Sequence, residues 1–224
     1  MNMNPTYQQQ AYGYVKNQIF KLNIKPGAYI TDTGIAQELQ ISRTPVREAF
    51  RRLEREGLLV YEPRRGWKVY SLTLHDFNEI FDIKVVVEGM VARQAAACKD
   101  EKLRQELKKS IKRLRKAADQ NDADAWIAID PELHGIIFKM ANNQRARRII
   151  ENLNEQYHRV QVGFVVRTER IQRSIVEHEA IVEAILSGDG DEAEKRMRDH
   201  QNQFRKELLS LLVDLVLPFA PNGV

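Results

Sequence analysis

The chain has 224 residues, a formal net charge of +4 and a single cysteine, Cys98. This length suits one large domain or two small ones, and one cysteine excludes an internal disulfide framework, which favours a reducing cytoplasm. The longest apolar run, residues 208–220, is too short to span a bilayer, and the first residues do not have the pattern of a signal peptide. We therefore expect a cytoplasmic protein with no membrane partner.

The positive charge is concentrated in the first third of the chain. Residues 1–70 contain 11 Lys and Arg against 6 Asp and Glu, a net charge of +5, which leaves −1 for the rest. This asymmetry indicates an anionic partner for the N-terminal part, and nucleic acid is the first candidate.

The first 70 residues predict three helices followed by a β-hairpin. Helices over 8–23, 31–40 and 43–57 are separated by short turns. Residues 58–72 then alternate as a two-stranded hairpin around the basic turn "PRRG". The sequence therefore predicts a winged helix-turn-helix domain over residues 1–70.

The third helix has two opposite faces. One is apolar, and the other carries arginines: Arg43, Arg47, Arg51 and Arg55. Guanidinium groups on such a face can contact DNA phosphates or guanine edges. The alternative is a solvated helix whose arginines pair with its own glutamates. The basic wing favours DNA, because its tip, with Arg65, can reach the neighbouring backbone or minor groove.

Residues 25–69, with the core "SRTPVREA", resemble the DNA-binding domain of the GntR superfamily of bacterial transcription regulators. The resemblance implies that Arg43, Thr44 and Arg47 contact double-stranded operator DNA and that Gly66 lies at the wing tip. In FadR, an arginine of the second helix also reads DNA, and Thr33 stands at the matching position here. Operator preferences that depend on that arginine therefore do not carry over.

After a linker over residues 71–74, residues 75–224 contain no further strand-like segment. Breaks at "KD", "QNDAD", "ANNQ" and "SGDGD" separate about six amphipathic segments. The expected fold is thus mostly α, with the small wing followed by an all-helical antiparallel bundle that also dimerises.

Three histidines lie on apolar faces of separate predicted helices, namely His134, His178 and His200, and Asp130 stands one turn before the first. A single buried histidine is more often a hydrogen-bonded core residue than a ligand. Together, however, the four side chains would all be satisfied by one divalent cation, and imidazole with carboxylate suits zinc or nickel.

The motifs "D-x-x-x-H" at 130–134, "EH" at 177–178 and "MRDH" at 197–200 look like the FCD effector domain of the FadR-like GntR branch. The resemblance implies one metal ion per chain, held by Asp130, His134, His178 and His200. It also implies a small organic acid as effector, with Asn143 at the position of a family asparagine. FadR senses acyl-CoA and lacks this metal set, so the full set favours the metal-binding members.

Lys84 and Glu88 share an apolar helical face. They form either an internal i,i+4 ion pair or a charged wall of the effector pocket. Relatives often have arginine where Lys84 stands, and lysine lacks its bidentate fork, so effector identity does not carry over. Arg159 and Arg167 are weaker candidates for the same role.

We predict a ligand-responsive transcription regulator, with repression as the favoured mode, that binds a near-palindromic operator as a homodimer. Alternatives are a regulator with a purely structural metal and a metal-free acyl-CoA-type sensor. A metal-dependent hydrolase is disfavoured, because four protein ligands already complete a tetrahedral site and no catalytic motif such as "HEXXH" is present.

Overall fold

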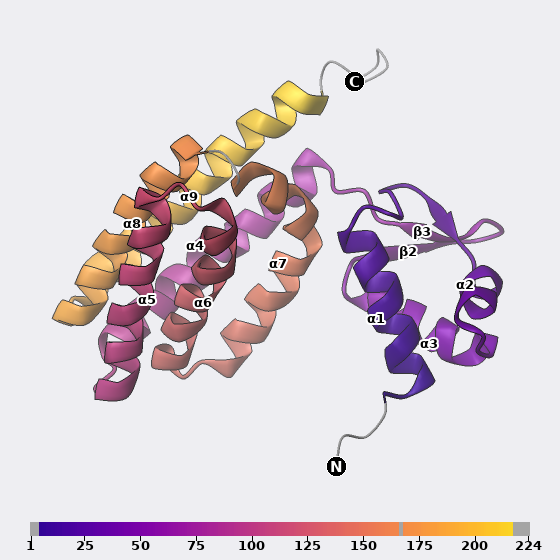
Figure 1. The fold of residues 1–224 in the computed structure, drawn as a ribbon, viewed down its shortest axis with the longest axis horizontal. Helices are drawn as coiled ribbons and strands as arrows, with labels where there is room; N and C mark the ends of the chain where they lie inside the picture. Colours follow the sequence, from indigo (N-terminus) through magenta and orange to yellow (C-terminus); the bar gives the residue numbers. More distant parts are fainter. Residues whose placement is uncertain (1–4, 166–167, 217–224) are drawn as a thin grey trace. The chain divides into compact units, whose positions relative to one another are not determined.

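The computed structural model describes residues 5–165 and 168–216 of the chain, drawn in Figure 1. The chain divides into two compact units, which are described separately: Met1–Thr73 groups with Glu155–Arg159, and Leu74–Asn154 groups with Val160–Val224. The predicted fold class, a mostly α chain with a small wing before an all-helical bundle, is confirmed.

From residue 5 to residue 73, the first unit contains three helices and a three-stranded antiparallel sheet. In chain order its elements are α1 (Tyr7–Phe20), β1 (Tyr29–Ile30), α2 (Asp32–Leu39), α3 (Arg43–Arg55), β2 (Leu59–Glu62) and β3 (Gly66–Val69). The strand order is β1-β3-β2, with Leu59 opposite Val69 and Tyr29 opposite Lys68. The hairpin was predicted, but β1 was not, because two residues are too few to show an alternating pattern.

Helix caps and one shared core fix these elements. Thr6 caps α1 and Thr31 caps α2, each with its side-chain oxygen on a backbone N–H. Helix α3 packs on α1, α2 and β2 through its fully buried residues, Val46, Ala49, Phe50 and Leu53. Trp67 of β3 lies edge-on to Phe50, with ring centroids 5.5 Å apart, so the base of the wing is attached to α3.

Every described element of the second unit is a helix. These are α4 (Leu74–Ala96), α5 (Glu101–Asp119), α6 (Ala123–Ala141), α7 (Gln144–Val165), α8 (Thr168–Ser187) and α9 (Gly190–Val216). Asp100 and Asp122 cap α5 and α6, which explains where these two helices begin. None of the helices over the described ranges is both long and apolar enough to cross a membrane.

Helix α4 packs on α6, α8 and α9, and α8 also packs on α5 and α9. The centre of this packing is apolar, with Leu133, Ile137, Ile175 and Met197 almost fully buried. Several polar side chains are nevertheless buried in the same unit, on α4, α5, α8 and α9: Lys84, Glu88, Ser110, Arg170, Ser174, His178, His200 and Gln201. Buried polar groups need partners, and their partners define the second of the two sites described next.

Candidate DNA-binding face and metal centre

The arginine face of α3 borders a hollow of about 560 Å³ in the first unit. Its lining comes from the start of α2, from α3 and from the wing: Ile30, Thr31, Asp32, Arg43, Arg47, Arg51, Glu54, Tyr61, Gly66 and Trp67. Thr44 is exposed in the first turn of α3, and Arg65 is exposed beside Gly66 at the wing tip. The side chains predicted to contact DNA thus belong to one unit, with four of them around a single concave surface.

One acidic side chain interrupts this basic face. The Asp32 carboxylate accepts hydrogen bonds from the Arg43 guanidinium, at 3.2 Å, and from Nε of Arg47. Burial raises the pKa of Asp32, but the hydrogen bonds from Arg47 and Arg43 outweigh burial and hold that pKa below its usual value. The sequence did not predict this contact, because Asp32 precedes the arginines by more than ten residues and lies on another helix.

In the second unit, α6, α8 and α9 bring His134, His178 and His200 together. One ring nitrogen from each lies within 4.8 Å of those of the other two. Nε2 of His134 is 3.1 Å from Nε2 of His178, whose Nε2 is also 3.3 Å from Oδ1 of Asp130. His178 is fully buried and His200 is 6% exposed. The four side chains predicted from the sequence therefore lie in one cluster, in which His178 and His200 are buried and Asp130 and His134 are partly exposed.

The outer nitrogens of two of these rings are fixed by acceptors. Nδ1 of His178 is 2.8 Å from the backbone carbonyl of Ser174, one turn earlier. Nδ1 of His200 is 2.7 Å from the Glu177 carboxylate, which Arg170 holds through two hydrogen bonds of 3.1 Å. A carbonyl or carboxylate can only accept, so these partners assign the proton to Nδ1 in both rings.

The third ring is held in the same way from α4. Nδ1 of His134 is 3.3 Å from Oε2 of Glu88, which also accepts from Nε2 of Gln201 at 3.0 Å. Lys84 donates to Glu88 at 2.5 Å and to Asn154 at 2.6 Å. The internal ion pair is thus present, and a role for Lys84 and Glu88 in binding an effector stays a prediction.

All three Nδ1 atoms act as donors. In each neutral ring the lone pair of Nε2 therefore points away from the residue that accepts the hydrogen bond from Nδ1. Nε2 of His134, Nε2 of His178 and Oδ1 of Asp130 then form a chain of acceptors with 3.1 and 3.3 Å between neighbours. Acceptors this close repel one another unless a cation or proton lies among them. Nitrogen and carboxylate donors with oriented outer nitrogens fit a zinc-type ion.

The pKa values of the three histidines in the cluster are shifted in different directions. Burial and the neighbouring His200 lower the pKa of His178 to about 3. Burial and His134 hold the pKa of His200 well below its usual value. Burial also opposes protonation of His134, but Glu88 and Asp130 outweigh burial and raise its pKa. A proton therefore binds His134 before the other two rings.

The Glu88 carboxylate beside His134 is itself held as an anion. Burial raises the pKa of Glu88, but Lys84 and His134 outweigh it and lower that pKa to about 2. Glu177 points away from the adjacent His178, because successive residues of a helix are about 100° apart around its axis. It reaches His200 of α9 instead. Spacing along one helix cannot show a contact made across two helices.

The remaining effector candidates are placed differently. Asn143 accepts the N–H of Ala146 at 3.1 Å, at the start of α7, and donates to Gln94 at 3.2 Å. Its effector role stays a prediction. The side chain of Arg159 and residue Arg167 lie outside the described residues.

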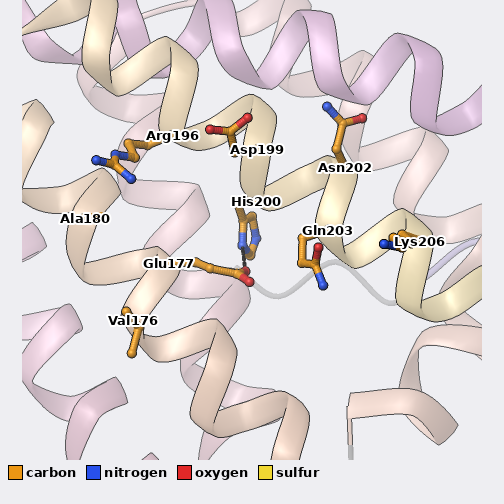
Figure 2. A pocket seen from close by; sticks show the side chains of 9 residues that line it. All are labelled: Val176, Glu177, Ala180, Arg196, Asp199, His200, Asn202, Gln203 and Lys206. Carbon is orange, nitrogen blue, oxygen red and sulfur yellow. Dashed lines mark hydrogen bonds and ion pairs between the residues drawn. The ribbon is translucent and has the colours of Figure 1, made fainter.

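A hollow of about 520 Å³ lies beside the cluster, between α8 and α9 (Figure 2). Its lining consists of Val176, Glu177, Ala180, Arg196, Asp199, His200, Asn202, Gln203 and Lys206. The bonded pair of Glu177 and His200 lies in its wall, and Arg196 and Lys206 add positive charge at its border. The hollow therefore joins one edge of the buried cluster to the surface of the unit.

Both units match known protein families. Residues 79–203 match the FCD domain, and residues 7–69 match bacterial regulatory proteins of the gntR family. The uncharacterized HTH-type transcriptional regulator YdhC of Bacillus subtilis (strain 168) is 28% identical, over 92% of each chain. The HTH-type transcriptional repressor RspR of Escherichia coli (strain K12) is 27% identical, over 92% of this chain and 91% of its own. The gluconate operon transcriptional repressor of Bacillus licheniformis is 27% identical, over 80% and 74%.

Solved structures share the fold at lower identity. E. coli McbR/YncC superposes with a TM-score of 0.73 and 20% identity, over 93% of this chain and 99% of that chain. A GntR family transcriptional regulator from Pseudomonas syringae pv. tomato str. DC3000 superposes with a TM-score of 0.53 and 18% identity, over 98% and 92%.

Replacing Arg47 tests the DNA-binding face. Arg47→Ala should weaken specific binding by about 1–3 kcal/mol if its guanidinium forks onto a guanine. The measurement is a titration of the full chain with an operator duplex selected by that chain from random DNA. Lys21→Ala, exposed just after α1 and outside the arginine face of α3, is the matched control. Unchanged affinity of the Arg47 variant would exclude this face as the reading surface.

Acidification tests the buried histidines. Unfolded histidines bind protons near pH 6.5, whereas folded His178 and His200 resist protonation until far lower pH. The unfolded state then binds more protons, so the unfolding free energy should fall as pH drops from 6.5. His134, with its raised pKa, acts in the opposite direction: its contribution is present below pH 6.5 and is lost above its folded pKa.

The expected net effect is a lower unfolding free energy at pH 5 than at pH 7, measured by urea denaturation of the chelator-treated chain. His75→Gln, which removes an exposed histidine outside the cluster, is the matched control. Equal stability of the wild-type chain at both pH values would contradict the protonation states assigned to the cluster.

Proposed function

Because this chain belongs to the gntR-family regulators with an FCD domain, we propose that it is a repressor controlled by a divalent metal ion and a small organic acid. It is a DNA-binding transcription regulator and not an enzyme, as the sequence predicts. Repression is supported by relatives that are themselves named repressors.

The metal part of the proposal is carried by the orientation of the three rings. His134, His178 and His200 would hold the ion through Nε2, with Asp130 as the carboxylate ligand. Ser174, Glu88 and Glu177 keep the Nδ1 protons outside, as acceptors around a metal-bound histidine do. Zinc or nickel matches this donor set, and the bound ion would supply a fixed positive charge that can accept a further oxygen ligand.

The effector part is supported by the hollow beside His200. Its volume of about 520 Å³ suits a small molecule, and its lining offers an anionic one two cations, Arg196 and Lys206, beside the carboxylates of Glu177 and Asp199. A carboxylate is the group that could satisfy both the ion and these cations. The gluconate operon repressors among the relatives are named after an operon for a small organic acid, which agrees with this class of effector.

Effector binding would act on DNA through a homodimer. A helix-turn-helix dimer that binds two symmetric half-sites needs a fixed spacing between its two recognition helices. The proposed metal ligands come from α6, α8 and α9, so a ligand that shifts one of these helices changes the bundle that sets this spacing. A coupling free energy of about 1–3 kcal/mol would suffice to release DNA.

Elemental analysis of the untagged full chain tests the metal site. We expect about one divalent ion per chain, since the four ligands surround a single position. His178→Ala should lose the ion, while His75→Ala, which changes an exposed histidine, should keep it. No bound ion after incubation of the wild-type chain with zinc or nickel would refute the metal part.

Glu177→Gln tests the metal site through the hydrogen bond that orients the His200 ring. The ion should remain at the same stoichiometry but bind about 10–100-fold more weakly, because the ring of His200 loses its anionic acceptor. Competition with a chromophoric chelator measures this change. Glu183→Gln, exposed on the same helix, is the control and should retain the wild-type affinity.

A panel of small carboxylic acids, gluconate included, tests the effector. At least one acid should weaken binding of the metal-loaded wild-type chain to its selected operator by about 5–150-fold. The same acid should have no effect on His178→Ala. If no acid in the panel alters operator binding, or if one acts equally on both proteins, an organic acid bound at the metal is excluded as the signal.

A further inference from the structure

We propose that Asp32 sets the specificity of DNA binding, by holding Arg43 and Arg47 away from backbone phosphates while leaving them able to contact base edges. It is a positioning residue at the DNA-binding face, and its role does not depend on the metal or on the effector.

The carboxylate is fixed where it lies. Asp32 is the first residue of α2, directly after the cap Thr31, whose Oγ1 accepts the N–H of Gly34 at 3.0 Å. The Asp32 side chain is only 14% exposed, whereas those of Arg43 and Arg47 are 54% and 56% exposed. A mostly covered acid at the start of α2 therefore holds two arginines that remain open to solvent.

Arg43 and Arg47 contact Asp32 through different nitrogen atoms of the guanidinium group. Arg43 approaches both carboxylate oxygens with Nη2, at 3.2 Å. Arg47 uses Nε, which lies on the inner side of its guanidinium. A bond through Nε leaves the outer edge, with both terminal amino groups, directed away from Asp32. That outer edge is the part of arginine that forks onto O6 and N7 of guanine.

Phosphate and base contacts are affected differently by this acid. A phosphate is an anion, so an arginine can bind it only by leaving Asp32 or by bringing two negative groups close together. Guanine O6 and N7 are neutral acceptors, and Arg47 can contact them while Nε stays on Asp32. Asp32 thus weakens sequence-independent binding, which depends almost wholly on phosphates, more than it weakens contacts to base edges.

The local charges agree with this role. The hollow beside α3 is lined by Arg43, Arg47 and Arg51 together with Asp32 and Glu54. Asp32 has a lowered pKa because of its two arginine partners, so it is an anion at neutral pH. Arg51 is not among the arginines bonded to Asp32 and remains the one suited to phosphates.

Removal of the charge tests the proposal in the full chain. Asp32→Asn is compared with wild type on a duplex of scrambled sequence and on an operator selected by the wild-type chain, over a series of salt concentrations. Glu38→Gln is the matched control, since it removes the same charge from the same helix but its carboxylate accepts from the Tyr14 hydroxyl.

Asp32→Asn should bind the scrambled duplex about tenfold more tightly and gain less on the operator, so that the ratio of the two affinities falls. The dependence of log K on log salt for the scrambled duplex should become steeper by about one to two units per DNA-binding unit, because the two released arginines neutralise phosphates. Glu38→Gln should change both affinities alike and leave the salt slope as in wild type.

Asp32→Glu keeps the charge and should restore most of the wild-type ratio. The proposal is wrong if Asp32→Asn leaves the ratio and the salt slope unchanged. It is equally wrong if the variant, shown to be folded by its thermal melt, loses operator affinity with no gain on the scrambled duplex, because Asp32 would then act only as a scaffold.

Discussion

The helical unit depends on one constraint, which is that three imidazole rings in an apolar interior have their Nδ1 atoms committed to acceptors. Ser174, Glu88 and Glu177 fix the protons on the outside of the cluster, so the Nε2 atoms and Asp130 face one another as acceptors. Such an arrangement is costly in a core unless a positive charge is shared among the rings. It explains why α4, α6, α8 and α9 all contribute polar residues to the same buried place.

Carboxylates have the decisive role in both units, with opposite consequences. Glu88 and Glu177 contact the Nδ1 atoms of His134 and His200, which leaves the Nε2 atoms of both rings for the proposed cation. Asp32 occupies arginines that would otherwise bind any phosphate nearby. In each case a fixed acid on one helix decides what a basic group on another helix can bind, and this gives the chain selectivity without additional basic residues.

Patterns within a single helix were predictable from the sequence. The four arginines of α3 recur every four residues opposite an apolar arc, and each of the three histidines lies on an apolar face, so a basic helix face and three buried histidines follow from periodicity. The meeting of these histidines, which lie on three helices, was predicted because one cation would satisfy all of them and because their motifs resemble the FCD domain. Other contacts between helices were not predictable, because they depend on how two helices cross. Examples are Asp32 with Arg47, and Glu177 with His200. Strand β1 was missed for a different reason, since its two residues carry no pattern.

X-ray absorption spectroscopy of the zinc-loaded full chain tests the central claim most directly, because it reports the atoms around the ion. The arrangement of His134, His178, His200 and Asp130 predicts three imidazole nitrogens at about 2.0–2.1 Å and at least one oxygen at a similar distance. In His178→Ala, the spectrum of any remaining ion should show fewer imidazole contributions. A wild-type spectrum with fewer than three imidazoles, or with a sulfur ligand from Cys98, would contradict the claim that these rings converge on one metal ion.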